Sequence, residues 1–459
     1  AYGAESRVSR WPPGTRMAYC NTGPTVAAYI VEKITGQRFE DYVQQNLFGP
    51  IGMKSATYFE PPAGVGTTLY HGDGKTPYPY WNIIYRPAGA INASANDMAP
   101  YVQFYLNRGT VNGVVVTPAA EIDRMESPAS TWAAKDGLVY GYGLSNYWSI
   151  QDGFVYHGHN GGVDGGLTEL AYMPDNGVGY FFSINSGNGD AFWRISKAIR
   201  SYITLKIEKP AVPAPVPLPG DASDYTGWYE PNAPRQQMYY FMDRIKDLAR
   251  VHFESGKMII ITGIRQKRIF VPVSGRQFRF VPDDGAPEPA ATAALLTPNP
   301  DGRFIEAGGT LRHLPAWLVW AEVGLLACFD LAMIAIGVYA PFWIIGGFFK
   351  KRRRPAERAM RLYPLAAVLS LIACMMIFSS SGNDFVNRLG HMTPWSAGLF
   401  LTTLAFAAAT IMGAWSVATA PPALVRPAVR WFSIAVSVML VIGLAYLAYW
   451  GVVGVRTWA

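Results

Sequence analysis

The first stretch whose residue types could do chemistry is the triplet Tyr19-Cys20-Asn21. A phenol can exchange protons with a reacting group, and an amide can hydrogen-bond a substrate. The triplet follows a Pro-Gly turn and directly precedes a helix signal, so both side chains should lie at a sharp bend and project into a cleft. Residues 80–82 repeat the Tyr-x-Asn spacing, so the prediction depends on this context and not on the triplet alone.

The second such stretch covers residues 156–166 and contains His157 and His159. Five glycines occur in the nine residues that begin at Gly158, which would let a ligand approach the backbone closely. The two histidines could also suggest a metal pair, but no nearby Cys, Asp or Glu cluster supplies further ligands at a familiar spacing, so we predict no metal. A plain flexible loop remains an alternative interpretation of the glycines.

Helices and strands in alternation must position these two stretches. Residues 24–35 predict a helix that stops at Gly36 and carries on one face the apolar residues Ala27, Ile30, Val31 and Ile34. A second helix should begin at Ser94, which can cap the amide of Asp97 while that carboxylate reaches back. Residues 168–173 and 178–184 predict an antiparallel hairpin. Residues 1–209 should therefore fold as an α+β domain.

A proline-rich linker and a small all-β domain are predicted next. Five prolines occur between Pro210 and Pro219, and they favour a stiff, extended linker over residues 210–220. Residues 221–314 hold short β-type runs separated by Gly, Pro and Asp, which predict a small sandwich or barrel of accessory function. These runs lie at residues 237–242, 257–262, 268–273 and 277–281.

The last segment, residues 315–459, predicts four transmembrane helices. Its four apolar blocks lie at residues 316–349, 362–380, 396–418 and 431–453. Each can cross a hydrocarbon core of roughly 30 Å, which needs about 20 helical residues. Asp330 is costly in lipid, so we expect it to face the helix bundle or a polar cavity and to serve as a structural partner.

The distribution of charge excludes one class of partner and orients the helices. The net charge is +7, but residues 350–361 hold seven Lys and Arg against Glu357, which leaves about +1 elsewhere and no nucleic-acid footprint. Arg426 and Arg430 lie in the loop before the last helix, whereas Arg388 alone lies between the second and third. The positive-inside rule places these basic loops in the cytoplasm and both globular domains outside. An anionic-lipid contact is a further expectation.

Together, the motifs of residues 1–205 resemble the serine β-lactamase and penicillin-binding-protein superfamily, in particular its class C branch with the related esterases and D-amino-acid peptidases. The resemblance implies a β-lactamase/transpeptidase-like domain, built from an antiparallel sheet with helices. Besides Tyr19-Cys20-Asn21, the matching segments are residues 12–15, 32–37, 47–53, 87–90, 140–144 and His159-Asn160-Gly161, which stands in the place of Lys-Thr-Gly or His-x-Gly.

The resemblance also implies roles for individual residues. Tyr19 would be the phenol that exchanges protons with the nucleophile and the leaving group, and His159 would polarise or bind the substrate from the facing strand edge. Asn21 would hydrogen-bond a substrate amide. Asn160, Gly161 and Gly162 would bind the substrate, with backbone N–H groups of that strand contributing to an oxyanion hole. No metal and no cofactor are implied.

One element of the family pattern does not occur. The family nucleophile lies in Ser-x-x-Lys, and no serine of this chain is followed by Lys three residues later. We expect this segment to be missing from the sequence by truncation, with degeneracy of the chain as the alternative. The chain as it stands should not form an acyl-enzyme.

The sequence thus predicts a membrane-anchored serine hydrolase on the outer side of a bacterial cytoplasmic membrane. Its expected partners are the lipid bilayer and a small-molecule or peptide substrate: a D-amino-acid peptide, a β-lactam or a small ester. A non-catalytic ligand-binding or sensing ectodomain coupled to the helices is the alternative. A transporter with an external domain is a third hypothesis, and only Asp330 supports it.

Overall fold

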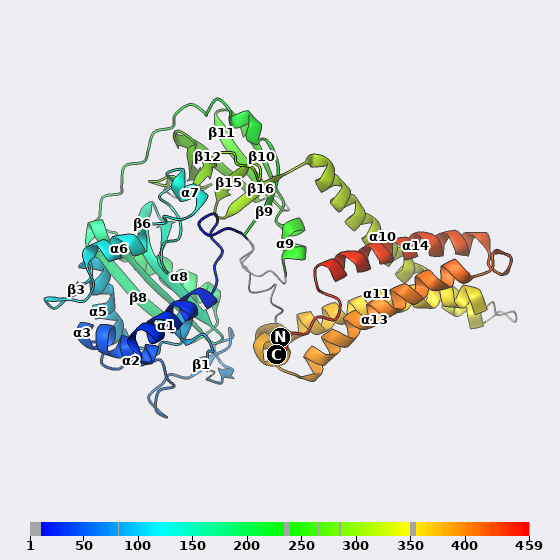
Figure 1. Ribbon diagram of the computed structural model, residues 1–459, viewed down its shortest axis with the longest axis horizontal. Helices are drawn as coiled ribbons and strands as arrows, with labels where there is room; N and C mark the ends of the chain where they lie inside the picture. The colour runs from blue at the N-terminus through cyan, green and yellow to red at the C-terminus, as the bar shows by residue number, and fades with distance from the viewer. Residues whose placement is uncertain are drawn as a thin grey trace. The chain divides into compact units, whose positions relative to one another are not determined.

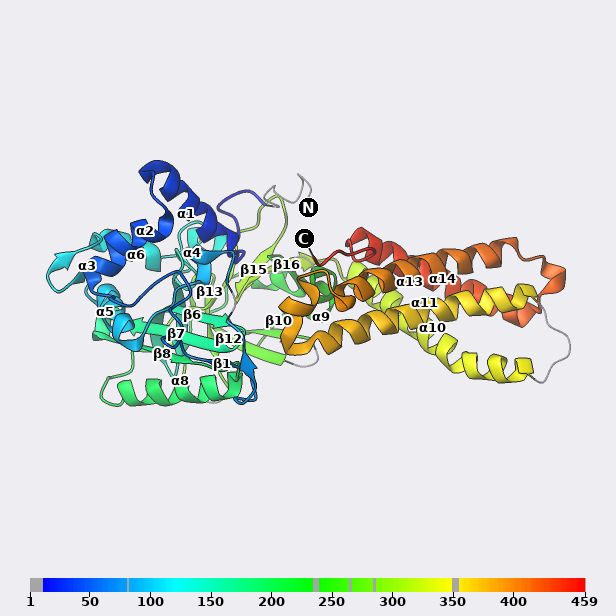
Figure 2. The same ribbon diagram turned by 90° about the horizontal axis from the view of Figure 1, so that it is seen from below.

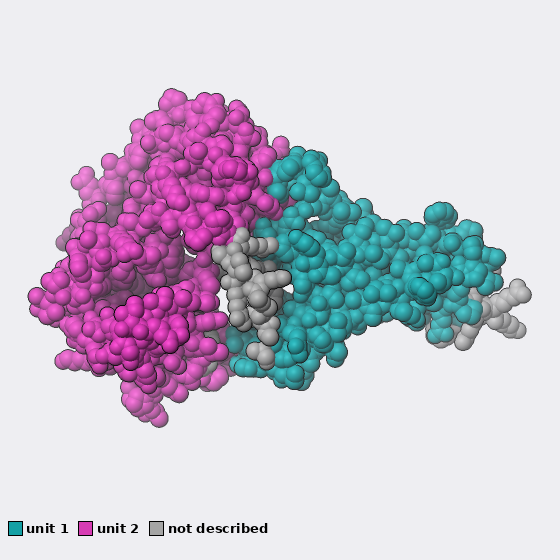
Figure 3. Space-filling model, in the orientation of Figure 1, with its two compact units in different colours: residues 1–7, 236–246, 314–459 teal, residues 8–235, 247–313 magenta. Residues whose placement is uncertain are grey.

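The computed structural model describes residues 11–80, 82–233, 239–263, 266–283, 286–348 and 355–458. The chain forms two compact units (Figure 3). The globular unit comprises residues 8–235 and 247–313, and the helical unit comprises residues 1–7, 236–246 and 314–459. The predicted combination of an α+β domain, a small all-β domain and four apolar helices is confirmed.

A four-stranded antiparallel sheet, in the order β5-β6-β7-β8, lies at the centre of the first domain (Figures 1 and 2). Its strands are β5 (Tyr147–Gln151), β6 (Phe154–Val163), β7 (Gly166–Met173) and β8 (Val178–Ile184). The predicted hairpin is confirmed, because β7 and β8 pair in antiparallel register around a turn that ends at Gly177. Gly177 has a φ of 61°, a left-handed conformation that glycine adopts without strain.

Helices cover both faces of this sheet. On one face, α8 (Gly189–Ile203) packs Ile199 and Ile203 into a cluster with Tyr156 and Tyr180. On the other face, α5 (Ala95–Leu106) places Phe104 and Tyr105 in a cluster with Tyr172. The alternation of side chains along each strand sends neighbouring residues to these two separate cores.

The two helices expected from the sequence both form. Helix α5 begins with the predicted capping box, in which the Ser94 side chain accepts from the Asp97 amide and the Asp97 carboxylate accepts from the Ser94 amide. Helix α1 (Thr22–Thr35) ends at Gly36, whose N–H bonds to the Glu32 carbonyl. The apolar face of α1 is open to solvent, since Ile34 is 79% exposed and Ala28 is the buried residue of this helix.

The remaining elements of this domain are short. Its helices are α2 (Phe39–Val43), η2 (Gln44–Phe48), α3 (Gly49–Ile51), α4 (Arg86–Gly89), α6 (Ala119–Glu126), α7 (Trp132–Lys135) and η3 (Pro174–Asn176). Two small hairpins complete it, β1 (Leu69–Tyr70) with β2 (Pro77–Tyr78) and β3 (Thr110–Val111) with β4 (Val114–Val115).

The second domain is a closed antiparallel barrel of eight strands in sequence order, which decides between the predicted sandwich and barrel. After η4 (Ala222–Tyr225), the strands are β9 (Gly227–Pro231), β10 (Ala249–Glu254), β11 (Lys257–Thr262), β12 (Gln266–Ser274), β13 (Gln277–Val281), β14 (Ala293–Leu295), β15 (Phe304–Ala307) and β16 (Thr310–Leu314). Apolar side chains fill the interior, and Tyr229, Val251, Ile260 and Phe278 are fully buried there.

The prediction of a strand over residues 237–242 is wrong for its described part. Tyr240 begins the short helix α9 (Tyr240–Lys246), and residues 237–238 lie outside the described residues. The segment belongs to the helical unit, where the Tyr240 ring packs against Trp450 and the Phe241 carbonyl accepts a 2.6 Å hydrogen bond from Tyr446. These tertiary contacts override the β-type composition of the run.

The barrel and the α+β domain share a core inside the globular unit. Ala133 and Leu138 of the first domain form one buried cluster with Leu296 and Phe304 of the barrel. The Arg16 guanidinium lies 4.7 Å from the Trp132 ring centroid and 5.4 Å from that of Phe304. The proline-rich residues 210–219 run between the domains without helix or strand.

The helical unit contains four helices long and apolar enough to cross a membrane: α10 (Ala316–Phe348), α11 (Pro355–Ser381), α13 (Pro394–Thr419) and α14 (Pro427–Tyr449). The short helices η6 (Gly382–Asp384), α12 (Phe385–Leu389) and η7 (Pro422–Leu424) connect them. Ile336, Ala367, Phe406 and Leu440, one from each long helix, are buried together.

Asp330 does not face the bundle, contrary to expectation. It is exposed on α10, and among the described residues no hydrogen bond or ion pair holds its carboxylate. Helical periodicity explains the orientation, because Ala332, Ile336 and Ala340 already occupy the packed face of α10. Residues 350–354, which carry five of the seven basic residues of the predicted loop, lie outside the described residues.

Candidate active site

Two aromatic side chains that are distant in sequence come together in the first domain. Tyr19 lies in the loop directly before α1, and His159 lies on β6. Their ring centroids are 6.1 Å apart and the rings are inclined by 36°. The structure therefore brings the phenol and the imidazole, predicted from separate stretches, to one site.

A third ring, Tyr142, completes the cluster and was not predicted as a site residue. Its hydroxyl lies 2.6 Å from His159 Nε2, and its ring centroid is 5.9 Å from that of Tyr19. Residues 140–144 contributed to the family resemblance, which was the available signal. The loop of Tyr142 passes so close to the Met125 backbone that only glycine fits at residue 143. A Cβ at Gly143 would lie 2.0 Å from the Met125 carbonyl oxygen.

The hydrogen bonds of His159 define its tautomer. Nδ1 lies against the backbone carbonyl of Asn160, which can only accept, so Nδ1 carries a proton. In the neutral ring, Nε2 is then an acceptor, and the Tyr142 hydroxyl donates to it. When the imidazole takes up a second proton, Nε2 becomes a donor and the positive charge forms beside the Tyr19 phenol.

The strand that carries His159 presents an uncovered edge at the site. Strand β5 pairs with β6 only as far as Tyr147↔Gly158, so within the described residues no strand covers this edge over residues 159–163. In antiparallel strands alternate N–H groups point to the same side. The Gly158 N–H donates to Asn146 Oδ1 and the Asn160 N–H to the Tyr147 hydroxyl, each over 3.0 Å, so the Gly162 N–H is the next donor along this edge.

The predicted glycines have different reasons for lacking a side chain. A Cβ at Gly161 would lie 2.6 Å from Thr168 Oγ1 on β7, so β6 and β7 approach too closely there for a larger residue. A Cβ at Gly162 would meet Leu167 at 3.3 Å, which a small shift relieves. Asn160, Gly161 and Gly162 are exposed, so the edge beside His159 is accessible.

Burial raises the pKa of Tyr147 to about 12, which keeps its hydroxyl neutral. This hydroxyl accepts the hydrogen bond from the Asn160 N–H.

A buried polar network lies beneath this edge and holds it in place. Asn146, which accepts from Gly158, donates over 2.8 Å to the Tyr172 hydroxyl, and that hydroxyl donates over 2.6 Å to Glu126. Glu126 is 6% exposed and receives a 2.7 Å ion pair from Arg108 Nη1. Arg108 thus compensates the charge of the buried Glu126 carboxylate. The hydrogen bonds that run from this carboxylate through Tyr172 and Asn146 end on the backbone of β6.

Asn21 occupies the N-cap position of α1 and is exposed. Its side chain makes no capping hydrogen bond to the helix. Its Cys20 neighbour is an exposed thiol, whose pKa is lowered by a hydrogen bond to the Thr22 side chain. The bend before α1 therefore presents Tyr19, Cys20 and Asn21 at the surface of the domain.

His157 is separate from this cluster. It is buried, its ring packs 4.8 Å from that of Trp148, and burial lowers the pKa of its imidazole. Its second ring neighbour, Tyr172, lies at 5.9 Å. The described residues contain no group of three His, Cys, Asp or Glu side chains that could hold a metal ion.

Comparison with known proteins gives the following relationships. Residues 5–199 match the family model described as Beta-lactamase. The chain is 27% identical over 235 residues to penicillin-binding protein 4 of Amycolatopsis lactamdurans, covering 48% of this chain and 61% of that protein. It is 27% identical over 228 residues to the D-aminopeptidase of Brucella canis, covering 49% of this chain and 40% of that protein. The chain thus spans less than two thirds of either relative.

Two solved structures are similar to the chain at lower sequence identity. The crystal structure of SurE with D-Leu has a TM-score of 0.39 at 19% identity and covers 67% of this chain and 70% of that chain. A β-lactamase/D-alanine carboxypeptidase from Yersinia pestis has a TM-score of 0.33 at 16% identity and covers 43% of this chain and 57% of that chain.

Proposed function

Because its residues 5–199 belong to the serine β-lactamase and penicillin-binding-protein superfamily, we propose that this β-lactamase-family hydrolase acts through an acyl-enzyme. The substrates we propose are D-amino-acid peptides, β-lactams or small esters. The names of the relatives, a penicillin-binding protein and a D-aminopeptidase, support this substrate class. The observation that carries the proposal is the 6.1 Å approach of the Tyr19 and His159 rings beside an uncovered strand edge.

In the proposed reaction the substrate lies along the β6 edge, as an added strand beside residues 159–163. Its scissile carbonyl receives the Gly162 N–H, which supports the negative charge that develops on oxygen in the transition state. The Asn21 amide binds the substrate backbone from the α1 side. Main-chain pairing at an open edge favours extended, peptide-like substrates, which agrees with the proposed class.

Tyr19 is the proposed proton carrier between nucleophile and leaving group. An ordinary phenol has a pKa near 10, so its anion needs stabilisation at neutral pH. A positive charge on His159, whose ring lies beside that of Tyr19, would attract the negative charge that develops on the phenol oxygen during proton transfer. The Tyr142 hydroxyl fixes the ring of His159 and thereby sets where this charge forms.

We also propose that the helical unit anchors the enzyme in a bacterial cytoplasmic membrane, with the globular unit outside. The four helices of suitable length and the positive-inside pattern of the loops support this orientation. The lipid bilayer and a small-molecule or peptide substrate are then the partners, and neither a nucleic acid nor a cofactor is required.

A panel of three substrates tests the proposal: a chromogenic cephalosporin, a D-alanyl p-nitroanilide and p-nitrophenyl butyrate. The protein should be produced from its complete reading frame in detergent. We expect turnover of at least one substrate and a loss of about 10²-fold or more in kcat for Tyr19→Phe, the usual effect of removing a general acid–base group. Tyr29→Phe on the exposed side of α1 is the matched control and should leave kcat unchanged. Equal activity of Tyr19→Phe and wild type would refute the role of Tyr19.

One observation favours a second function, a non-catalytic ligand-binding ectodomain. The 459 residues contain no Ser-x-x-Lys, the segment that supplies the nucleophile in the family. Sequencing the reading frame upstream of Ala1 separates the two functions. A Ser-x-x-Lys there supports the enzyme, whereas a complete reading frame without one leaves the same site to bind its ligand without cleaving it.

A further inference from the structure

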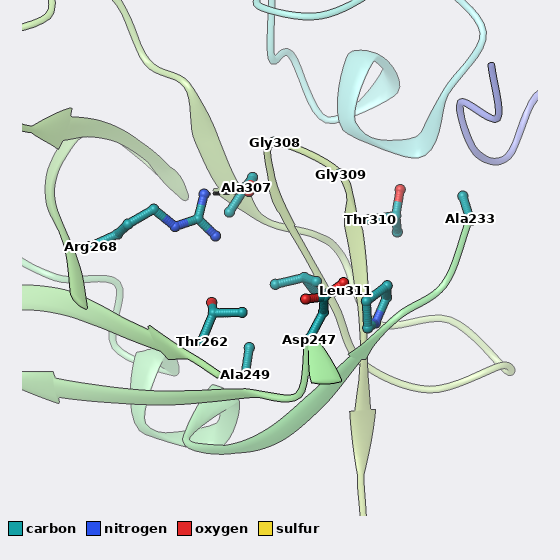
Figure 4. A pocket seen from close by; sticks show the side chains of 11 residues that line it. Ala233, Asp247, Ala249, Thr262, Arg268, Ala307, Gly308, Gly309, Thr310 and Leu311 are labelled. Carbon is teal, nitrogen blue, oxygen red and sulfur yellow. Dashed lines mark hydrogen bonds between the residues drawn. The ribbon is translucent and has the colours of Figure 1, made fainter. Parts of the chain in front are cut away.

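The barrel contains a cavity of about 250 Å³ at one end of its interior (Figure 4). Its volume lies just below the range of roughly 300–1,000 Å³ that is usual for drug-sized ligands, so it suits a smaller molecule. The mouth of an eight-stranded barrel is a common place for a small ligand. The lining residues are Pro231, Ala233, Asp247, Ala249, Thr262, Arg268, Ala307, Gly308, Gly309, Thr310 and Leu311.

Two polar residues of the lining occupy inward positions of the barrel. Along β11, Met258 and Ile260 are fully buried in the core, and Thr262 continues this inward row. Along β12, Phe270 belongs to the same core, and Arg268 lies two residues before it on the same face. The inward register thus places a hydroxyl and a guanidinium above an otherwise apolar interior.

Neither of these polar groups meets a charged partner within the described residues, although the Arg268 guanidinium lies 5.7 Å from the Phe270 ring centroid. Within the part of the chain that the structure describes, Thr262 Oγ1 is buried without a hydrogen-bond partner. Arg268 donates one 3.0 Å hydrogen bond to the Ala307 carbonyl, and among the described residues no carboxylate forms an ion pair with it. Burial accordingly lowers the pKa of its guanidinium. A buried polar group without its full set of hydrogen bonds is destabilising, so a polar ligand that completes these bonds would be bound favourably in the cavity.

Three other arginines of the barrel differ from Arg268 because each is paired with a carboxylate. Arg276, Arg303 and Arg312 each form an ion pair with a carboxylate of the same domain. Asp247 stands at the cavity but forms no ion pair with Arg268 and, among the described residues, has no other hydrogen-bond or ion-pair partner. Figure 4 shows Arg268 and Asp247 reaching the cavity from different segments. One cavity therefore holds a cation and an anion that do not neutralise each other.

We propose that this cavity binds a free α-amino acid with an apolar side chain. The α-carboxylate pairs with Arg268 and accepts from the Thr262 hydroxyl, the α-ammonium pairs with Asp247, and the side chain lies on Ala249 and Leu311. A zwitterion is the ligand class that satisfies both charges, whereas Asp247 disfavours a simple anion and Arg268 a simple cation. The site is separate from the Tyr19–His159 cluster and does not depend on the proposed hydrolase activity.

Calorimetric titration of the full chain in detergent with leucine tests this proposal. Each enantiomer is titrated beside 4-methylpentanoate, which lacks the ammonium group, and 3-methylbutylamine, which lacks the carboxylate. We expect at least one enantiomer of leucine to bind at least tenfold more tightly than both analogues. Absence of leucine binding, or equal binding of 4-methylpentanoate, would overturn the proposal.

Variants assign the binding to this cavity. Arg268→Gln and Asp247→Asn should each weaken leucine binding by about tenfold or more, because each removes a charge-assisted hydrogen bond. Arg250→Gln is the matched control, since Arg250 is exposed on the neighbouring strand β10 and does not line the cavity. Thr262→Val, which keeps the shape of the side chain, tests the site if Arg268→Gln does not fold. Leucine binding that is unchanged in Asp247→Asn and Thr262→Val contradicts this location.

Discussion

The hydroxyl of Tyr172 joins the buried Glu126 carboxylate to the β6 edge, so Tyr172→Phe should destabilise the globular unit. The substitution removes one hydrogen bond to a charged group, worth about 1.5–3 kcal/mol, and one from Asn146, worth about 0.5–1.5 kcal/mol. The ring itself stays in place, because Tyr172 is fully buried and Phe preserves its packing. We expect a loss of about 3 kcal/mol.

Thermal unfolding of the chain in detergent measures this loss. For a unit of this size, about 3 kcal/mol corresponds to a fall of roughly 5 °C in the midpoint of the globular transition. Hydrogen exchange provides the local readout, since the Gly158 amide bonds to Asn146 and should exchange faster in the variant.

A matched control is available in the same stack of rings. Tyr105 is 5% exposed, its ring centroid lies 4.9 Å from that of Tyr172, and its hydroxyl shares one neutral 3.2 Å hydrogen bond with Tyr101. Tyr105→Phe should cost only about 0.5–1.5 kcal/mol and leave exchange in β6 unchanged. Equal destabilisation by the two substitutions, or unchanged exchange at β6 in Tyr172→Phe, would refute the role assigned to the network.

Three further predictions concern single residues. Tyr142→Phe should lower kcat about tenfold and move the pH–rate profile, because the His159 imidazole loses the hydroxyl at Nε2; a profile identical to wild type contradicts this. Burial alone would raise the pKa of Asp97, but hydrogen bonds from Ser55 and Ser94 lower it to about 2, so its stabilisation is complete above about pH 4 and disappears as the pH falls toward 2. Asp97→Asn should remove this part of the pH dependence of the thermal midpoint, and an undiminished dependence argues against it. Cys20, with its lowered pKa, should react with iodoacetamide faster at pH 7 than an ordinary thiol, and loss of the Thr22 hydroxyl in Thr22→Val should slow it.

The parts of the fold that follow local rules were predictable from the sequence. The capping box at Ser94, the glycine stop of α1 and the hairpin of β7 and β8 depend on residues a few positions apart, and the structure has them as expected. The four apolar helices were equally predictable, because the length that spans a bilayer is fixed.

The remaining features depend on tertiary contacts that one sequence does not display. The β-type run at Tyr240 becomes helical because its partners, Trp450 and Tyr446, come from the far end of the chain. Asp330 lies on the exposed side of α10, because apolar residues such as Ala332 and Ile336 occupy the packed face of that helix. The placement of Tyr19 beside His159 was an inference from family resemblance, and Tyr142 had no signal for its role beyond the motif that contained it.

Covalent labelling tests the central claim, that Tyr19 and His159 serve one acyl-transfer site. The protein from its complete reading frame is treated with a fluorescent penicillin or a fluorophosphonate, and the labelled peptide is identified by mass spectrometry. We predict a stable adduct on one serine in the wild type and in Tyr29→Phe, and its loss in both Tyr19→Phe and His159→Ala. Undiminished labelling of the last two variants, or no adduct on the wild type with either probe, would contradict the account.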